Sequence, residues 1–370
     1  MNRKDAEGKN VFQGGFLGLD NISIFNRSED LPTGGSLTQA DATSWMAMYC
    51  LNMFSISMEL SIEDPSYEDM SSKFFEHFLY IADAINYHKK DVPPLWNEED
   101  GFYYDLLHYP NGDHEPLKVR SMVGLIPLFA IATITEKQIE RHQGFKRRFE
   151  WFLENKKGLC EEVASMKKRG EKDRHLLAIL DKNKLTRILK VMLDENEFLS
   201  PYGIRSVSLI HKDHPYVLDM NGSLHRIGYE PAESKSDLYG GNSNWRGPIW
   251  FPMNFLIIES LQKFHYYYGD SFKIEFPTGS GNYLTLWDIA GEIAHRLMHI
   301  FQIDEKTNKR AVFNGNEILQ SNPHFKNNIL FYEYFHGDNG SGLGASHQTG
   351  WTSIIAKLIV QYGKYVCEME

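Results

Sequence analysis

The amino-acid sequence predicts an all-α fold in which antiparallel helix pairs form a ring: a toroid of inner and outer helices, with small β pieces in its loops. About eight helical segments follow one another along the chain. A helix that is apolar on nearly all sides is followed by a helix with one apolar stripe, and this pairing recurs. Loops rich in glycine and aromatic residues separate the segments. Ordinary helical-bundle packing is the alternative that this pattern leaves open.

The first two helices show the pairing most clearly. Residues 39–60 form a helix that is apolar nearly all round, which is typical of a helix enclosed by others. Asp64 and Pro65 are a helix-start signal for a second helix. This second helix carries a single apolar stripe with charges opposite, as expected of an outer helix; the stripe consists of Met70, Phe74, Phe78, Ile81 and Ile85.

The remaining elements follow in order along one domain that spans residues 1–370 without a linker. Residues 1–38 are expected to be loop, and residues 96–105 a small turn-and-strand piece. A run rich in Lys, Glu and Arg at 156–175 is expected to be a charged surface excursion. Residues 198–249 form a long loop, and its length and aromatic content favour a functional role. Further helices are expected at 119–133, 137–155, 176–195, 250–268, 284–302 and 347–364.

Composition excludes some function classes. The chain has 370 residues, of which 42% are hydrophobic and 13% aromatic, so it can bury a sizeable core. Its net charge of −10 disfavours nucleic acid as a partner, because nucleic acid selects basic surfaces. No apolar run is long enough to span a bilayer, so no membrane partner is expected.

Cysteine usage points to a reducing compartment. Only Cys50, Cys160 and Cys367 are present, too few and too scattered for a disulfide framework or a metal knuckle. The polar start of the chain suggests no secretory signal, and we therefore expect a cytoplasmic protein without a metal or other cofactor.

Two motifs far apart in the chain each place one carboxylate in a loop rich in glycine and aromatic residues. The first is GGFLGLDNISIFNRS at 14–28, which contains Asp20. The second is FYEYFHGDNGSGLGASHQTGW at 331–351, which contains Glu333. Two carboxylates held among aromatic residues are the equipment for breaking a glycosidic bond.

The two carboxylates differ in their surroundings. Asp20 has apolar neighbours, and partial burial would raise the pKa of its carboxyl, as a general acid needs. Glu333 lies between Tyr332 and Tyr334, where a general base would activate a water. Taken singly, Asp20 could be a turn residue and Glu333 a solvent-facing strand residue.

A third motif, NWRGPIWFPMNF at 244–255, has the composition of a sugar-binding segment. Trp245 and Trp250 would offer flat apolar faces, and the fork of Arg246 would bind hydroxyl groups. Burial of Arg246 would be unfavourable without a partner. Asp41, at the start of the first helix, could be a helix-terminal charge or a sugar ligand.

Other sources of chemistry are weaker. Glu230, Glu233 and Asp237 form a rival cluster of carboxylates. His295 and His299 are four residues apart but lack the glutamate of a metalloprotease helix. No phosphate-binding glycine loop and no serine nucleophile elbow are present.

Taken together, these motifs resemble the C-terminal catalytic domain of glycoside hydrolase family 63. The resemblance rests on GGFLGLDNISIFNRS, LTQADATSWMAMYCLNM, NWRGPIWFPMNFL and EYFHGDNGSGLGASHQTGWTS, and it spans roughly residues 10–365. That family includes processing α-glucosidase I and the mannosylglycerate and glucosylglycerate hydrolases.

The resemblance implies an (α/α)6 barrel and an inverting hydrolase of α-linked glucosides or mannosides. It implies that Asp20 is the general acid and Glu333 the general base. The substrate would be an oligosaccharide or small glycoside. The residues assigned to substrate binding are Phe16, Asn21, Gln39, Asp41, Tyr202, Arg205, Trp245, Arg246, Gly247, Trp250, Tyr332, His347 and Trp351.

The chain departs from the family pattern in one respect. Asp20 lies near its start, and about eight helices are expected where the full toroid has twelve. We therefore expect an incomplete barrel, completed by a missing N-terminal part or by an oligomer partner, because an open barrel exposes apolar inner faces.

Two other functions remain open from the sequence. The chain could be a catalytically silent glycan-binding or assembly fragment of such an enzyme. It could also be another toroid enzyme, such as an epimerase or a polysaccharide lyase, with His211, His214 or Tyr202 as the base. Tyr202 and Arg205 lie in the long loop at 198–249, the expected selector of the sugar.

Overall fold

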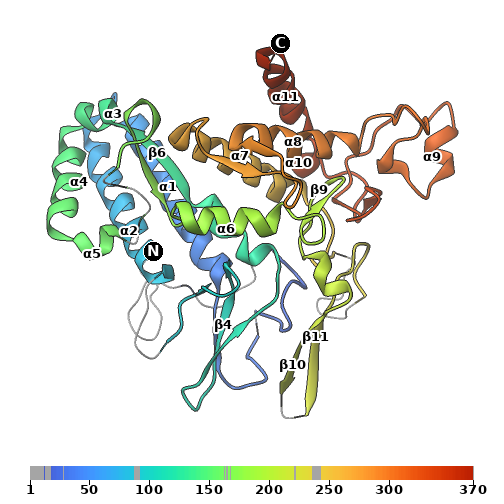
Figure 1. The fold of residues 1–370 in the computed structure, drawn as a ribbon, viewed down its shortest axis with the longest axis horizontal. Coiled ribbons are helices and arrows are strands. Elements are labelled where there is room, and N and C mark those ends of the chain that lie inside the picture. Colours follow the sequence, from blue (N-terminus) through green and yellow to red (C-terminus); the bar gives the residue numbers. More distant parts are fainter. Residues whose placement is uncertain are drawn as a thin grey trace.

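The computed structural model shows a helix-rich fold with many small strand pieces (Figure 1). It describes residues 12, 18–27, 29–86, 92–161, 163, 166, 168–220, 222–235 and 243–369. The helices are α1 (Ala40–Leu60), α2 (Glu68–Asn86), α3 (Glu136–Arg141), α4 (Gln143–Asn155), α5 (Lys157–Glu161), α6 (Lys182–Met192), α7 (Phe251–Tyr268), α8 (Leu286–His299), α9 (Glu317–Ser321), α10 (Thr349–Thr352) and α11 (Ile355–Met369).

The strands are short and antiparallel, and most pair as two-stranded hairpins. One three-stranded sheet has the order β1-β4-β5. The strands are β1 (Ser36–Thr38), β2 (Trp96–Asn97), β3 (Phe102–Tyr103), β4 (Asp105–His108), β5 (His114–Leu117), β6 (Ile131–Thr135), β7 (Arg174–Ala178), β8 (Leu199–Ser200), β9 (Gly203–Ile204), β10 (Tyr216–Met220), β11 (Ser223–Ile227), β12 (Lys273–Glu275), β13 (Tyr283–Thr285), β14 (Tyr334–Phe335) and β15 (Gly342–Leu343).

Helices α1 and α2 form the first antiparallel pair, at the left of Figure 1. The helix expected at 39–60 is confirmed as α1. The Asp64 side chain accepts a hydrogen bond from the Ser66 amide and starts a 3-10 turn that leads into α2, so the helix-start signal is confirmed. The Ser71 hydroxyl donates to the Ser57 hydroxyl (2.9 Å) between the two helices.

An aromatic cluster joins this pair to α4. Phe75 of α2 is fully buried, and its ring centroid lies 5.4–5.8 Å from those of Phe145, Phe149 and Phe152. Phe54 of α1 contacts two of these rings, those of Phe75 and Phe145. The cluster forms part of one continuous hydrophobic core that extends through both helix pairs.

Helices α7 and α8 form the second antiparallel pair, and α11 packs against α8. Both α7 and α8 confirm helices expected from the sequence, at 250–268 and 284–302. Thr285 starts α8 with a capping box, in which its side chain accepts from the Asp288 amide and the Asp288 side chain accepts from the Thr285 amide.

The predicted helices at 119–133 and 176–195 were wrong in part. Residues 119–133 hold two 3-10 turns and the start of β6, and the end of β7 precedes α6 in the second segment. Pro127 and the β-branched residues between Ile131 and Thr135 favour an extended chain over a continuous helix. The antiparallel pair of β6 and β7 contacts α1 on one side and α7 on the other, and thereby connects the two helix pairs (Figure 1).

Two other predicted helices are each divided in two. The segment at 137–155 contains α3 and α4, separated by a non-helical His142 with φ −107° and ψ 82°. The segment at 347–364 contains α10 and α11. The periodicity of apolar residues continues across such breaks, which is why it does not reveal them.

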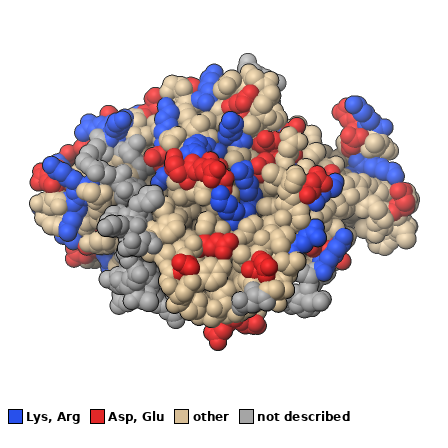
Figure 2. Space-filling model, turned by 60° about the horizontal axis from the view of Figure 1, so that its bottom comes forward, with Lys and Arg blue, Asp and Glu red and all other residues tan. Residues whose placement is uncertain are grey.

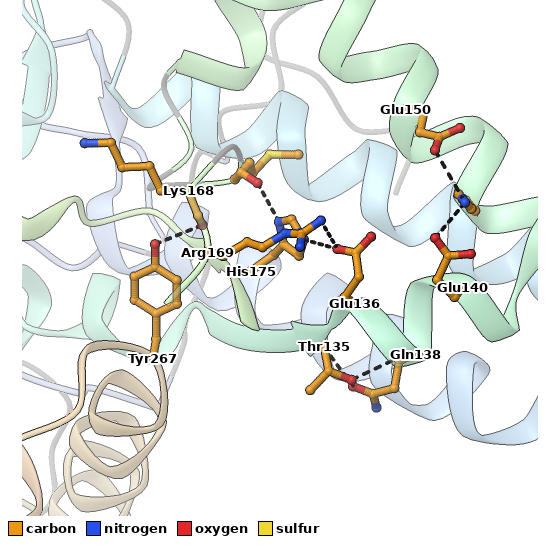
Figure 3. A network of polar contacts seen from close by, with 11 residues as sticks. Thr135, Glu136, Gln138, Glu140, Glu150, Lys168, Arg169, His175 and Tyr267 are labelled. Carbon is orange, nitrogen blue, oxygen red and sulfur yellow. Dashed lines mark hydrogen bonds and ion pairs between the residues drawn. The ribbon is translucent and has the colours of Figure 1, made fainter. Parts of the chain in front are cut away.

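The charged segment at 156–175 has many exposed residues and is also anchored to the core at several points. Cys160, Val163 and Met166 are buried within it. The Tyr267 hydroxyl donates to the Lys168 carbonyl (3.1 Å), and His175 contacts both the Met166 carbonyl and the Glu136 carboxylate (Figure 3). The surface excursion stays a prediction for the segment as a whole, and these buried residues show that parts of it contact the core.

The long segment at 198–249 is not structureless where it is described. It contains the hairpins β8–β9 and β10–β11 and a 3-10 turn at Leu209–Lys212. The β10–β11 hairpin and the β1-β4-β5 sheet share a second, smaller hydrophobic cluster, which includes Leu107, Leu218 and Ile227. Ile24 and Phe25 belong to the same cluster, which therefore supports the chain just after the acid motif.

Acidic and basic side chains are interspersed on the face of the molecule that Figure 2 shows. Among the residues that the structure describes, no helix is both long and apolar enough to cross a bilayer.

The packing of the aromatic cluster predicts how much stability is lost when one of its rings is removed. Phe75→Ala should lower the free energy of unfolding by about 3–5 kcal/mol, because it leaves a cavity between α1, α2 and α4. Phe325→Ala, at a ring that is 47% exposed, should change it by less than about 0.5 kcal/mol. Urea unfolding of both variants measures this, and equal losses would contradict the packing described.

Candidate active site

The described part of the first motif, residues 18–27, contains a tight turn whose apolar residues fix the position of Asp20. Leu19 and Ile22 are buried on either side of it, and the Ile22 amide donates to the Leu19 carbonyl (3.4 Å). Asp20 itself is half-buried. The sequence therefore holds one carboxyl at the edge of the core, between two buried apolar side chains.

The environment of Asp20 raises the pKa of its carboxyl above the ordinary value of 3.8. Burial is the largest cause. A hydrogen bond from the Ser243 hydroxyl lowers this pKa, and the charge of Glu333 raises it again. Glu333 is 313 positions from Asp20 in the sequence. Its effect on the pKa of Asp20 indicates that the fold brings the two carboxyls near enough to interact.

The motif at 331–351 holds Glu333 next to the β14–β15 hairpin. Tyr334 and Phe335 of β14 are fully buried and fix the strand. The Glu333 amide donates to the Ala345 carbonyl (2.9 Å), and the Ala345 amide donates to the Glu333 carboxylate (3.1 Å). The carboxylate is thus oriented by a backbone amide of the glycine-rich loop that follows.

A glycine makes room for this carboxylate. Gly344 has a φ of +69°, and a Cβ there would lie 2.7 Å from Glu333 Oε2. A side chain at position 344 would therefore displace the carboxylate as well as strain the backbone.

Trp245 and Trp250 form an internal stack instead of a sugar platform. Their ring centroids are 3.9 Å apart with an interplanar angle of 5°. The Trp250 ring also stacks on Tyr334 at 4.7 Å. The two indoles are only 3% and 1% exposed, so neither offers a free face, and the expectation that they stack on a sugar is corrected. Trp351, 39% exposed and 5.5 Å from Trp250, presents an accessible ring.

Arg246 is buried, and its hydrogen-bond and ion-pair partners are other groups of the protein. Its Nε donates to the Asn21 carbonyl (2.7 Å) and one terminal nitrogen donates to the Ser23 carbonyl (3.3 Å). Its other terminal nitrogen lies 3.7 Å from the Glu230 carboxylate. Burial lowers the pKa of Arg246, and Glu230 opposes that shift. These protein groups satisfy the guanidinium, which the sequence motif had assigned to sugar hydroxyls.

The Asn21 side chain is likewise engaged with protein. Its Oδ1 accepts from the Trp245 amide (2.7 Å), and its Nδ2 donates to Asn244 (3.1 Å) and Ser234 (3.0 Å). Asn21 is buried, so the structure gives it a role in joining two loops.

Asp41 belongs to a buried ion cluster. Its carboxylate pairs with Arg27 at 2.8 Å, and the Asp105 carboxylate lies 3.6 Å from the same guanidinium. Asp105 also accepts from the Ala40 amide (2.8 Å) at the start of α1. Because Asp41 has no exposed surface, the structure corrects its assignment to a sugar and supports the internal charge as the role of this residue.

Asp41 and Asp105 share the guanidinium of Arg27, and their proximity affects the pKa of Asp105. Burial raises the pKa of Asp105 to about 7, and the charge of Asp41 adds to that effect. Arg27 and the Ala40 amide act in the opposite direction.

Gln39 differs from its neighbours because its side chain is fully buried with both polar atoms unpaired. An unpaired buried amide costs about 1–3 kcal/mol. It lies at the N-terminus of α1, and its assignment to substrate binding stays a prediction.

The remaining predicted residues are spread around this centre. Arg205 is buried and bonds the Leu199 carbonyl, Tyr229 and Asp338. Tyr202 lines a separate hollow of about 720 Å³ beside His295 and His299, and neither Asp20 nor Glu333 lines it. Phe16 lies outside the described residues.

The last three candidates belong to the loops around Glu333 and Trp245. Gly247 has a φ of +150°, and a Cβ there would lie 2.6 Å from the Tyr229 ring. Tyr332 is half-buried, with its carbonyl bonded by the Thr352 hydroxyl (2.5 Å). His347 is exposed, and its ring centroid lies 5.8 Å from that of Phe331.

The carboxylates and histidines that the sequence offered as alternative catalytic groups have other surroundings. Glu230 pairs with Arg246, whereas the charge of Glu233, together with that of Glu333, raises the pKa of Tyr334 after burial as the main cause. Glu233 is thus a third carboxylate near the centre, and Asp237 lies outside the described residues. His211 accepts from the Arg120 amide (2.9 Å) and bonds the His214 carbonyl (2.9 Å), so both ring nitrogens are occupied.

Sequence reasoning missed Ser243 and Asn244. Ser243 bonds Asp20, and Asn244 bonds Asn21, the Arg246 amide and the carbonyls of Glu230 and Ala232. Their position in the sequence could have revealed them, because two small polar residues directly precede Trp245-Arg246-Gly247.

Comparisons with known proteins agree with this arrangement of motifs. Residues 175–352 match the family described as "Mannosylglycerate hydrolase MGH1-like glycoside hydrolase domain". "Uncharacterized protein YMR196W" of Saccharomyces cerevisiae is 51% identical over 378 residues, 98% of this chain and 34% of that protein. A "Probable mannosyl-oligosaccharide glucosidase" of Schizosaccharomyces pombe is 27% identical over 181 residues, 48% of this chain and 16% of that protein.

A solved structure is also similar: a GH63 mannosylglycerate hydrolase from Thermus thermophilus in complex with glucose. It shares 14% identity with a TM-score of 0.37, over 90% of this chain and 46% of that chain. The chain thus spans about a third, or less, of the length of the curated relatives. The resemblance to glycoside hydrolase family 63 is confirmed by the matched family.

The ion cluster predicts a pH-dependent effect on stability. The pKa of Asp105 is higher in the folded chain than its ordinary value of 3.8, so the stability gained from its protonation is complete below that value and is lost as pH rises through about 7. Asp105→Asn should therefore stabilise the fold relative to the parent chain most at pH 8 and less at pH 5, because at pH 5 only part of the protonation-linked stability has been lost. Urea unfolding at both pH values measures this; the exposed Asp213→Asn should show no such difference.

The contact between Ser243 and Asp20 predicts opposite shifts in two variants. Ser243→Ala should raise the pKa of Asp20, because it removes a donor to the carboxylate. Glu333→Gln should lower the pKa of Asp20, because it removes a nearby negative charge. Carboxyl-carbon NMR titration measures both, and shifts of the same sign would rule out this arrangement.

Proposed function

We propose that this chain, whose residues 175–352 match the mannosylglycerate hydrolase MGH1-like glycoside hydrolase domain, cleaves α-linked glucosides or mannosides with inversion at the anomeric carbon. Asp20 is the general acid and Glu333 the general base. The observation that carries the proposal is the electrostatic effect of Glu333 on the raised pKa of Asp20. The relatives described as glucosidase and as mannosylglycerate hydrolase support glucosides or mannosides as the substrate class.

The proposed chemistry follows from the different environments of the two carboxyls. Asp20, half-buried and with a raised pKa, donates its proton to the glycosidic oxygen as the bond from that oxygen to the anomeric carbon breaks. Glu333 takes a proton from a water whose oxygen attacks the anomeric carbon from the opposite face. The products are the free alcohol and a sugar of inverted configuration, which requires about 6.5–9.5 Å between the carboxyls.

The surroundings supply orientation for this reaction. The Ala345 amide keeps one oxygen of Glu333 occupied and so leaves the other for the water. Trp351 offers an exposed ring at the same loop cluster, suited to the apolar face of a sugar. Glu233 adds negative charge near the centre, which suits a transition state with positive charge at the anomeric carbon.

A second candidate function is favoured by exposed apolar side chains on the helices. Tyr49, Ile56 and Leu60 of α1 are 44–51% exposed, and Ile359 and Val360 of α11 are 54% and 60% exposed. Such faces are typical of surfaces that another segment covers. Under this alternative the chain is a glycan-binding or assembly part of a larger toroid, and catalysis needs the covering part.

The catalytic proposal is tested with 4-nitrophenyl α-glucoside and α-mannoside. Asp20→Asn and Glu333→Gln should each lower kcat by about 10²–10⁴-fold, the usual contribution of a general acid or base. Asp30→Asn, at an exposed carboxylate of the same region, should leave kcat unchanged. Proton NMR of the first product formed should show the β-anomer; the α-anomer would contradict inversion, and an inactive parent chain would favour the assembly function.

A further inference from the structure

One short segment, Ser243–Trp250, contacts the supports of both proposed catalytic carboxyls. It is described throughout, and its residues from Asn244 onward are buried. Its N-terminal half bonds the loop that carries Asp20, and its C-terminal half bonds the strand beside Glu333. Because the two carboxyls lie 313 positions apart in the chain, noncovalent contacts must fix their separation.

On the acid side, the contacts hold Asp20 and the residues that follow it. The Ser243 side chain also acts on the Asp20 carboxyl, whose pKa it lowers. The Trp245 amide donates to the Asn21 side chain at 2.7 Å. Arg246 donates to the carbonyls of Asn21 (2.7 Å) and Ser23 (3.3 Å), which are the first and third residues after the acid.

On the base side, the contacts form a piece of sheet and a ring stack. The amides and carbonyls of Ile249 and Phe335 exchange two hydrogen bonds, of 2.8 and 3.0 Å. Phe335 is the second residue after Glu333. The Trp250 ring stacks on Tyr334, the residue that directly follows the base, at 4.7 Å.

The segment itself has little freedom to move. The Trp245–Trp250 stack closes it on itself, and the Trp250 indole donates to the Asn244 carbonyl (2.9 Å). The Gly247 amide donates to the Ser206 hydroxyl (3.0 Å), and the Tyr229 ring fills the place of a side chain at position 247. A segment fixed in this way transmits position from one end to the other.

Resting on the proposed function, we propose that Ser243–Trp250 is a rigid spacer that sets the separation of Asp20 and Glu333, and that Arg246 is the positioning residue that holds the acid loop on it. Arg246 acts through backbone carbonyls and does not itself contact the sugar. This differs from the substrate-binding role that the sequence motif suggested for it.

The spacing matters because an inverting hydrolase must fit a water between the base and the anomeric carbon. A displacement of about 1 Å of a catalytic group costs about 100-fold in rate. A lysine at position 246 keeps the charge, but its single ammonium replaces a planar fork that reaches two carbonyls and Glu230.

The test compares Arg246→Lys with a matched control, Arg296→Lys. Arg296 also donates to a backbone carbonyl, that of Ser200 (2.8 Å), and pairs with a glutamate, Glu195 (3.2 Å), but it lies on α8. Hydrogen–deuterium exchange of peptides covering residues 18–27 and 331–345 is measured by mass spectrometry, together with kcat, KM and the pH dependence of kcat.

We expect Arg246→Lys to speed exchange at 18–27, to lower kcat about 100-fold with KM little changed, and to move the alkaline limb of the pH profile to lower pH. The last effect follows because burial is the largest cause of the raised pKa of Asp20, and a released loop loses that burial. Arg296→Lys should change none of the three.

Unchanged exchange at 18–27, or a raised KM with kcat retained, would overturn the proposal and assign Arg246 to the sugar. If the parent chain is inactive, the catalytic proposal fails for this chain, and the exchange measurement alone decides whether Arg246 holds the acid loop. If Arg246→Lys does not fold, Glu230→Gln is the milder variant, because it removes the ion pair of Arg246 but leaves its two hydrogen bonds to the acid loop, and it should speed exchange at 18–27 to a smaller degree.

Discussion

The buried guanidinium of Arg246 is the group on which the arrangement of the centre depends. A charged group out of water must be hydrogen-bonded, and the acceptors nearest to Arg246 are two carbonyls of the acid loop and the carboxylate of Glu230. The loop that carries Asp20 is therefore held where its carbonyls satisfy the arginine. The same short segment then continues into the bridge between Ile249 and Phe335, next to Glu333.

The helices provide the frame for this centre without entering its chemistry. The pair α1–α2, the pair α7–α8 and the two-stranded β6–β7 sheet between them share one continuous core. The acid turn lies near the start of α1, where Asp105, Arg27 and Asp41 join the chain that follows the turn to the helix. The Trp-Arg-Gly segment leads directly into α7. Both motifs are thus tied to the start of a helix of the frame, which limits their freedom to move.

Aromatic residues serve two purposes that a sequence does not separate. Trp245, Trp250 and Tyr334 form an internal stack that supports the two carboxyl-bearing segments, while Trp351 keeps an accessible ring. All four come from motifs that look equally suited to sugars. Apolar rings that stack on each other gain from burial and ring geometry, so they can position polar loops without competing for their hydrogen bonds.

Local sequence patterns predicted the helices α1, α2, α7 and α8 and the motifs that hold the candidate catalytic carboxyls. The apolar periodicity of α1, α2, α7 and α8 is a local property, since residues three and four apart share a helix face whatever the rest of the chain does. The sequence also placed Asp20 and Glu333 in glycine-rich loops. Three features became evident from the fold alone: Arg246 and Asn21 bond each other's loops, two tryptophans are buried, and 119–133 is extended in part. Those outcomes depend on contacts such as that between Asn21 and Trp245, 224 positions apart, and no local pattern encodes which distant segment a side chain will meet.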